Sequence, residues 1–141
     1  MKPIVLASDH GGFELKEVIK EHLMYKDFRV EDIGCFNEES VDYPDMARKG
    51  CLSIKKHNTY GIFVCGSGIG ICIAANKVAG IRAALCHSEV YAQLARQHND
   101  ANVLCLGGRF LDVELALRMV DIFLETQFLG GRHKKRVDMM G

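Results

Sequence analysis

Short runs of apolar residues alternate along the chain with longer segments in which apolar residues recur every three or four positions. Five of the short runs have the length of buried strands, at positions 4–8, 28–33, 61–65, 81–86 and 103–106. The longer segments have the i, i+3, i+4 spacing of helices that pack one face against a sheet. Because the short runs are continuously apolar rather than alternating, each strand is expected to be covered on both faces.

The longer segments predict five helices. Their periodic residues span positions 15–23, 46–55, 71–78, 88–97 and 115–123, and the apolar run 71–78 is expected to be a short, well-buried helix. Pro44 suits the first turn of the second helix, and Ser88 and Asp112 can cap the fourth and fifth. Gly130 and Gly131 are expected to end the last helix.

This order of elements predicts a fold class. Strand–helix alternation repeated five times indicates right-handed crossovers and a doubly wound, five-stranded parallel sheet of the Rossmann-like or flavodoxin-like type. A chain of 141 residues fits one compact domain. We therefore expect residues 1–141 to form a single three-layer α/β/α domain, with 131–141 as a basic C-terminal segment.

Composition excludes several classes of protein. Eighteen basic residues balance eighteen acidic ones, which argues against nonspecific nucleic-acid binding and against a polybasic membrane anchor. No stretch approaches about 18 consecutive apolar residues, and the first strand follows Pro3 directly, without a signal peptide. The six cysteines form no CxxC pair and lie mostly in apolar runs. Reduced thiols, a cytoplasmic location and no structural zinc site are expected.

The position of the candidate chemistry follows from the sheet. In open parallel sheets, ligands bind beyond the carboxyl ends of the strands, near the point where the strand order reverses. The residues that directly follow strands are therefore candidates: Asp9, His10, Cys65, Ser67, His87, Gly107, Gly108 and Arg109. His98 and Asn99 instead follow a helix, so topology alone assigns them to the opposite end of the sheet.

The glycine-rich loop 66–70 is the sharpest local feature. Its glycines allow a tight turn with several N–H groups aimed at one point, and the following helix N-terminus favours a negative charge there. The loop matches neither a dinucleotide fingerprint nor a Walker A motif. It predicts a cradle for a phosphate or a reaction oxyanion, with a plain tight turn as the alternative.

Two further features have both a chemical and a structural interpretation. Cys65 stands at a strand end beside a helix N-terminus, a setting that favours the thiolate, but a small buried thiol fits the position too. Cys72 and the other four cysteines are expected to be buried apolar residues. Arg132 and Arg136 are four positions apart, so one helical turn would direct both guanidinium groups at a phosphate. The alternative is a solvated tail.

Taken together, these segments resemble the type B ribose-5-phosphate isomerases, a family that includes the galactose-6-phosphate isomerase subunits. The resemblance covers essentially the whole chain and is carried by Ser8-Asp9-His10-Gly11-Gly12-Phe13, Asp42-Tyr43-Pro44, Cys65-Gly66-Ser67-Gly68-Ile69-Gly70, Ala74-Ala75-Asn76-Lys77, Gly80-Ile81-Arg82-Ala83, Ala95-Arg96-Gln97-His98-Asn99-Asp100-Ala101-Asn102 and Gly131-Arg132-His133. It implies interconversion of ribose 5-phosphate and ribulose 5-phosphate through a cis-enediolate, in the pentose phosphate pathway, without metal or cofactor.

The resemblance also implies a role for each matching residue. Cys65 is expected to move the proton between C1 and C2, Ser67 to move protons at the enediolate oxygens, and His98 with Asp9 to open the sugar ring. The expected substrate-binding residues are Asp9, His10, Tyr43, Gly66, Ser67, Gly68, Ile69, Gly70, Asn99, Arg109, Arg132 and Arg136. Within this set, the loop amides are the expected anion hole, His10 and the arginines the phosphate clamp, and Tyr43 and Asn99 the contacts to sugar hydroxyls.

Two departures within the family bear on this chain. Some members lack the cysteine and carry a glutamate base just after the glycine loop; that position is Ile71 here, so the chain resembles the cysteine type. Ser67 replaces a threonine and keeps the hydroxyl. The resemblance further implies that His98, Asn99 and Arg109 reach into the active site of a neighbouring subunit, so that a homodimer, or a tetramer, is expected.

Two other functions fit the same residues. An isomerase of six-carbon sugar phosphates, such as allose 6-phosphate or galactose 6-phosphate, would share the constellation and differ in the depth of its pocket. A non-catalytic phosphate-binding module would use the loop and the arginines, but it would have no use for Cys65, Asp9 and His98 together.

Overall fold

The computed structural model describes residues 1–141 and contains one five-stranded, all-parallel sheet. The strands are β1 (Ile4–Ser8), β2 (Val30–Gly34), β3 (Gly61–Cys65), β4 (Ala83–Leu85) and β5 (Val103–Gly107). Their order across the sheet is β2-β1-β3-β5-β4. The strand order therefore reverses beside β1 and β3, which places the predicted switch point at the carboxyl ends of these two central strands.

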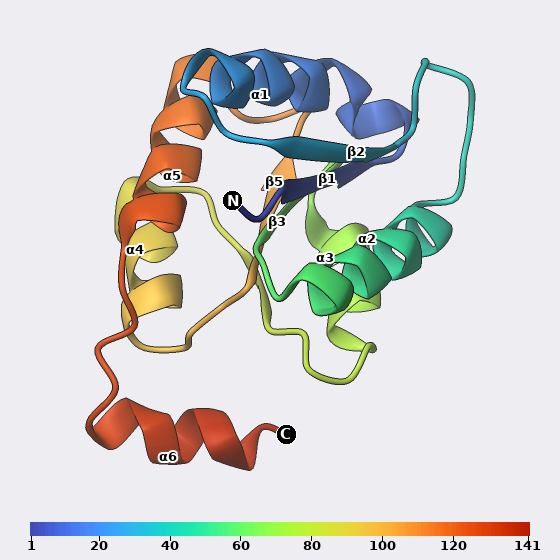
Figure 1. The fold of residues 1–141 in the computed structure, drawn as a ribbon. Helices are drawn as coiled ribbons and strands as arrows, with labels where there is room; N and C mark the ends of the chain where they lie inside the picture. Colours follow the sequence, from blue (N-terminus) through green and yellow to red (C-terminus); the bar gives the residue numbers. More distant parts are fainter.

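Helices cover both faces of the sheet (Figure 1). They are α1 (Phe13–Tyr25), α2 (Tyr43–His57), α3 (Ile69–Asn76), α4 (Glu89–Gln97), α5 (Val113–Glu125) and α6 (Arg132–Met139), with a short 3-10 turn, η1 (His10–Gly12), before α1. One face packs against α1, α4 and α5, and the other against α2 and α3. The predicted three-layer α/β/α fold is confirmed.

The strands hold the two halves of the core together. Every residue of β1, β3 and β5 is buried, and successive side chains point to opposite faces. Leu6 and Ile62 belong to the cluster under α1, α4 and α5, whereas Val5 and Phe63 belong to the cluster under α2 and α3. The continuous apolar runs of the sequence reflect this burial on both faces.

Helix starts follow the predicted caps, but one helix end does not. The hydroxyl of Ser88 accepts a hydrogen bond from Tyr91 N, and the Asp112 carboxylate accepts one from a first-turn N–H of α5. The prediction that Gly130 and Gly131 end α5 is wrong. The helix ends at Glu125 because the backbone becomes extended at the next residue, and the two glycines instead precede α6 with positive φ angles.

A buried ion pair fastens α1 to the edge strand β2. The Lys16 side chain is fully buried, and its ammonium lies 2.7 Å from Asp32 and 2.7 Å from Glu17, while Lys20 lies 3.0 Å from Asp32. Burial alone would raise the pKa of Asp32, but the hydrogen bonds from the two lysines lower it below its ordinary value. The carboxylate thus stays charged and compensates a lysine that has no access to water.

Candidate active site

A cavity of about 490 Å³ opens at the carboxyl ends of β1, β3 and β5. It is lined by Asp9, Tyr43, Cys65, Gly66, Ser67, Ile69, Gly70, Ile73, Arg109 and Phe110. Eight of these ten are residues that the sequence singled out. They converge because parallel strands deliver the residues that follow them to one edge of the sheet.

The thiol of Cys65 lies at the base of the glycine loop. Its side chain is 4% exposed, and the backbone N–H of Gly68 donates to Sγ at 3.2 Å. Gly68 adopts a φ of +79°, and a Cβ there would lie 2.6 Å from Leu85 and 2.8 Å from the backbone of Leu106. Only glycine fits this turn, and the turn aims a backbone donor at the sulfur.

The loop also carries a hydroxyl and free backbone donors. Ile69 N donates to Ser67 Oγ at 3.2 Å, which fixes the hydroxyl at the start of α3. The N–H groups of Ser67 and Gly70 make no hydrogen bond within the chain. Free N–H groups at a helix N-terminus bind anions, so the loop can hold a developing oxyanion or a phosphate beside the thiol.

Asp9 and His10 follow β1 at the neighbouring wall. Asp9 is buried, and its carboxylate accepts the N–H of Gly12 at 3.1 Å, which caps the turn η1. His10 Nδ1 accepts the N–H of Val41 at 3.2 Å, so its proton belongs on Nε2, where it can donate to a ligand. His10 lines a second cavity that adjoins the first, because Arg109 lines both.

The structure corrects the expectation for Arg109. This residue lies in the cavity of its own chain, against the glycine loop, rather than reaching toward a neighbour. Arg109 N donates to Gly66 O at 3.1 Å, and a Cβ on Gly66 would lie 2.9 Å from Arg109 Nη1. The reason is that Arg109 follows β5, which pairs with β3, and glycines at positions 11 and 66 leave room for the guanidinium. That guanidinium has no ion-pair partner in the chain.

Tyr43 begins α2 on the other side of the loop. An added Cβ on Gly70 would lie 2.6 Å from Tyr43 Cζ and 2.9 Å from its hydroxyl oxygen. The absence of a side chain at Gly70 therefore lets the phenol approach the glycine loop. Its hydroxyl makes no hydrogen bond within the chain and stays available to a ligand.

His98 and Asn99 lie at the opposite end of the sheet, as topology predicted. They follow α4, and the loop that continues from them reaches the amino end of β3, where Gly61 N donates to Asn102 O at 2.9 Å. The His98 ring stacks on His133 of α6, with ring centres 4.2 Å apart. The stacking connects α6 to the end of α4.

The basic C-terminal segment, expected to be either a helical turn or a solvated tail, forms a helix. Figure 1 shows α6 standing apart from the rest of the molecule. It carries Arg132 and Arg136 on the side of the molecule where His98 lies, and both arginines are exposed. Partial burial and the neighbouring charges lower the pKa of His133 below its usual value. The predicted site residues thus fall into two groups, one around Cys65 and one around His98.

Two apolar side chains at the cavity mouth were missed by the sequence analysis. Ile73 is 58% exposed and Phe110 is 78% exposed, and both line the cavity beside Cys65. The prediction of a well-buried helix at 71–78 is therefore wrong in part, because α3 covers the sheet with one side and leaves Ile69 and Ile73 facing outward. The residues at 71–75 are all apolar, so no polar residue among them reveals which face is exposed.

The other cysteines differ among themselves. Burial raises the pKa of Cys51 to about 12 and of Cys86 to about 11, and it also raises the pKa of Cys105. Cys72 is only half-buried, which corrects the expectation of a buried residue, and a hydrogen bond from the Cys105 thiol lowers its pKa. Cys72 is therefore a second chemically accessible thiol.

The molecule has neither a metal-binding cluster nor a helix that could span a membrane. No group of three or more histidine, cysteine or acidic side chains is arranged to hold a metal ion. None of the helices combines the length and the apolar character that crossing a membrane requires.

Comparison with known proteins gives concordant matches over nearly the whole chain. A family model described as Ribose/Galactose Isomerase matches residues 4–140. A Mycoplasma genitalium protein named probable ribose-5-phosphate isomerase B is 49% identical over 138 residues, which span 96% of this chain and 91% of that protein. The crystal structure of a Thermotoga maritima ribose 5-phosphate isomerase has a TM-score of 0.96 and 51% identity, and the match covers 99% of this chain and 97% of that one. A Mycoplasma genitalium ribose-5-phosphate isomerase B crystallised with bound ribulose-5-phosphate has a TM-score of 0.93 and 48% identity, with 98% and 93% of the two chains covered.

Proposed function

The chain belongs to the ribose/galactose isomerase family, and from this membership we propose that it interconverts ribose 5-phosphate and ribulose 5-phosphate. The observation that carries the proposal is the thiol of Cys65, held at 3.2 Å by the N–H of Gly68 at the floor of a cavity whose wall offers free backbone donors. A base beside an anion hole is what proton transfer next to a carbonyl requires. The named relatives and the ribulose-5-phosphate complex support this substrate.

In the proposed reaction, Cys65 takes the proton from C2 of the open-chain aldose and returns it to C1. Negative charge develops on the enediolate oxygens, where the N–H groups of the glycine loop stabilise it because they are already oriented by the turn. The Ser67 hydroxyl, oriented by Ile69 N, moves the proton between these oxygens. Tyr43 contacts a sugar hydroxyl, and Arg109 and His10 bind the phosphate group of the substrate.

The proposal includes an active site shared by two protomers. Asp9 lies near Cys65, whereas His98, its expected partner in ring opening, lies at the other end of the sheet with Asn99, Arg132 and Arg136. A second copy could bring this group to the cavity of the first, which supports a homodimer as the smallest active form. With the free cysteines of the chain in reducing surroundings, we propose that the enzyme acts in the cytoplasm, in the pentose phosphate pathway.

Replacement of Cys65 tests the proposal. Cys65→Ala should lower the turnover of ribose 5-phosphate by at least a thousandfold and leave the melting temperature nearly unchanged, because it removes the base and a single buried sulfur. Cys72→Ala is the matched control and should retain turnover. Near-parental turnover of Cys65→Ala would refute the assignment. Faster turnover of allose 6-phosphate or galactose 6-phosphate by the unmutated chain would refute the pentose substrate.

A further inference from the structure

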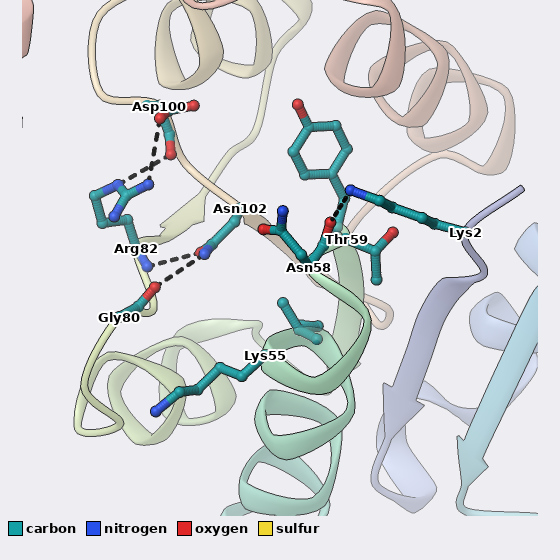
Figure 2. A pocket seen from close by; sticks show the side chains of 10 residues that line it. Lys2, Lys55, Asn58, Thr59, Gly80, Arg82, Asp100 and Asn102 are labelled. Carbon is teal, nitrogen blue, oxygen red and sulfur yellow. Dashed lines mark hydrogen bonds and ion pairs between the residues drawn. The ribbon is translucent and has the colours of Figure 1, made fainter.

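The cavity at the amino end of the sheet is bordered by hydrogen bonds that are already complete. It measures about 610 Å³ and lies between the end of α2, the start of β4 and the loop after α4 (Figure 2). Lys2 Nζ donates to Asn58 O at 2.9 Å. The Asn102 side chain accepts from Arg82 N at 2.8 Å and donates to Gly80 O at 3.0 Å. Polar groups that are paired in this way offer little to a ligand, so their role is to hold the chain.

The segment that they hold is the loop 98–102, which carries His98 and Asn99. Arg82 Nε donates to Asn99 O at 3.2 Å and to Asp100 O at 3.0 Å, and its Nη2 lies 3.4 Å from the Asp100 carboxylate. Figure 2 shows the Arg82 guanidinium turned toward Asp100. Asp100 has a φ of +47°, a left-handed conformation that needs support from its surroundings in any residue other than glycine.

A second arginine, Arg96, bonds the same Asp100 carboxylate from the interior of the protein. Arg96 is 3% exposed, and its Nη1 donates to Asp100 Oδ1 at 2.8 Å. The rest of its guanidinium is fixed by the body of the domain, through Thr126 O at 3.2 Å and the Tyr60 hydroxyl at 2.7 Å. Its carbon Cζ lies 4.5 Å from the centre of the Tyr60 ring. Arg96 therefore fixes the position of the loop 98–102 relative to the core of the domain, and not only relative to helix α4.

We propose that Arg82 and Arg96, through Asp100, are positioning residues for the ring-opening step. This inference rests on the proposed function, in which His98 and Asn99 act in the site of the partner. The two arginines touch no substrate. They fix the backbone on which these two side chains stand, and displacement of a catalytic group by about 1 Å can cost on the order of a hundredfold in rate.

The chemistry of the two sugars separates ring opening from proton transfer. Ribose 5-phosphate closes to a furanose and must be opened before C2 can lose its proton. In ribulose 5-phosphate the C5 oxygen carries the phosphate, so no five-membered ring forms. Exchange of a C1 hydrogen of ribulose 5-phosphate with deuterium from D2O then needs only Cys65 and the glycine loop. At saturating ribulose 5-phosphate, where a weaker Asn99 contact to the substrate no longer limits the rate, a lesion confined to the His98 loop impairs isomerisation of the furanose and spares this exchange.

Arg82→Met is the test, because methionine keeps the apolar stem and removes every side-chain donor to the loop, while the backbone N–H of residue 82 still bonds Asn102. Lys55→Met is the matched control: Lys55 lines the same cavity and makes no hydrogen bond or ion pair with the loop (Figure 2). We expect Arg82→Met to isomerise ribose 5-phosphate at least tenfold more slowly and to retain deuterium exchange within about twofold. Lys55→Met is expected to retain both rates.

Either of two results would overturn the inference: parental isomerisation by Arg82→Met, or a parallel loss of both rates, which marks general damage. If Arg82→Met does not fold, Asp100→Asn decides by the same two rates, because asparagine tolerates the left-handed backbone and removes the charge that both arginines bond. The rate of the unmutated protein on ribose 5-phosphate is measured first and tests the proposed function separately.

Discussion

Mixing two inactive variants gives a quantitative test of the shared active site. Cys65→Ala removes the proposed base, and His98→Asn removes the proposed ring-opening acid. Each homodimer should be nearly inactive on ribose 5-phosphate. When equimolar amounts are mixed and the subunits exchange, hybrid dimers should regain activity, because each hybrid has one site with both lesions and one site with neither.

Cys65 and His98 are too far apart in one chain to act on the same substrate, so recovered activity requires a hybrid dimer. β3 runs from Gly61 to Cys65, four steps of about 3.3 Å, or about 13 Å. Cys65 stands at its carboxyl end, and the loop that follows His98 is bonded to Gly61 at its amino end, through Asn102. Two groups so far apart cannot both contact the reacting end of one five-carbon sugar. With random exchange, half of the dimers are hybrids and half of their sites are intact, so recovery should reach about one quarter of parental activity.

The assay is the rate of ribulose 5-phosphate formation before and after mixing. Exchange is monitored independently by native mass spectrometry of subunits with different tags, and Cys65→Ala mixed with itself is the control. Absence of recovery despite complete exchange would mean that one chain supplies both residues, and the shared site would be wrong.

Three further predictions follow from single side chains. Iodoacetamide at pH 8 should alkylate both Cys65 and Cys72, and ribulose 5-phosphate should protect only Cys65; equal protection of both thiols in peptide mass mapping would contradict the site. Asp32→Asn should lower the free energy of unfolding at pH 7 by about 3 kcal/mol, because it leaves the buried Lys16 with only the more exposed Glu17 as its charged partner. The pKa of Asp32 is lowered in the folded protein, so the stabilisation is present above about pH 4 and is lost as the pH falls through the folded pKa; a deficit in urea denaturation that is as large at pH 2.5 as at pH 7 would refute the pairing. Gly70→Ala should raise the KM for ribose 5-phosphate on the order of tenfold, because the new methyl group displaces the Tyr43 phenol and the substrate loses one hydrogen bond. An unchanged KM would show that Tyr43 does not contact the substrate.

The fold could be predicted from the sequence where its signals are local. Continuous apolar runs mark strands that are buried on both faces, and the caps Ser88 and Asp112 mark helix starts through one side chain each. The helix α6 escaped prediction because Val137 is its one buried residue, so it has almost no apolar periodicity. The end of α5 was misplaced because its true signal is a change in backbone conformation at Thr126, a residue with no special preference for ending helices.

Only part of the candidate site could be predicted from local signals in the sequence. Asp9, Cys65 and Arg109 each lie at or just beyond the carboxyl end of a strand, and parallel strands bring residues in such positions together whatever the details of packing. Nothing in the pattern of a single chain reports which residues meet across two chains, so the place of His98 rested on the resemblance to known isomerases. The exposed side of α3 and the accessible Cys72 depend on how one helix is rotated on the sheet, which an apolar run does not encode.

The separation of α6 from the α/β body has a consequence for how catalysis depends on enzyme concentration. With Val137 as its one buried residue, this helix gains little from its own chain. In the proposed shared site, a phosphate held by Arg109 of one protomer and by Arg132 and Arg136 of the other would be a non-covalent cross-link between two polypeptides. By mass action, a ligand that binds only the assembled form stabilises it by about 2.7 kcal/mol at a hundred times its dissociation constant. If the site is shared as proposed, substrate supply regulates assembly as well as flux: scarce sugar phosphate and dilute enzyme favour separate, inactive chains, and abundant substrate recruits them into active pairs.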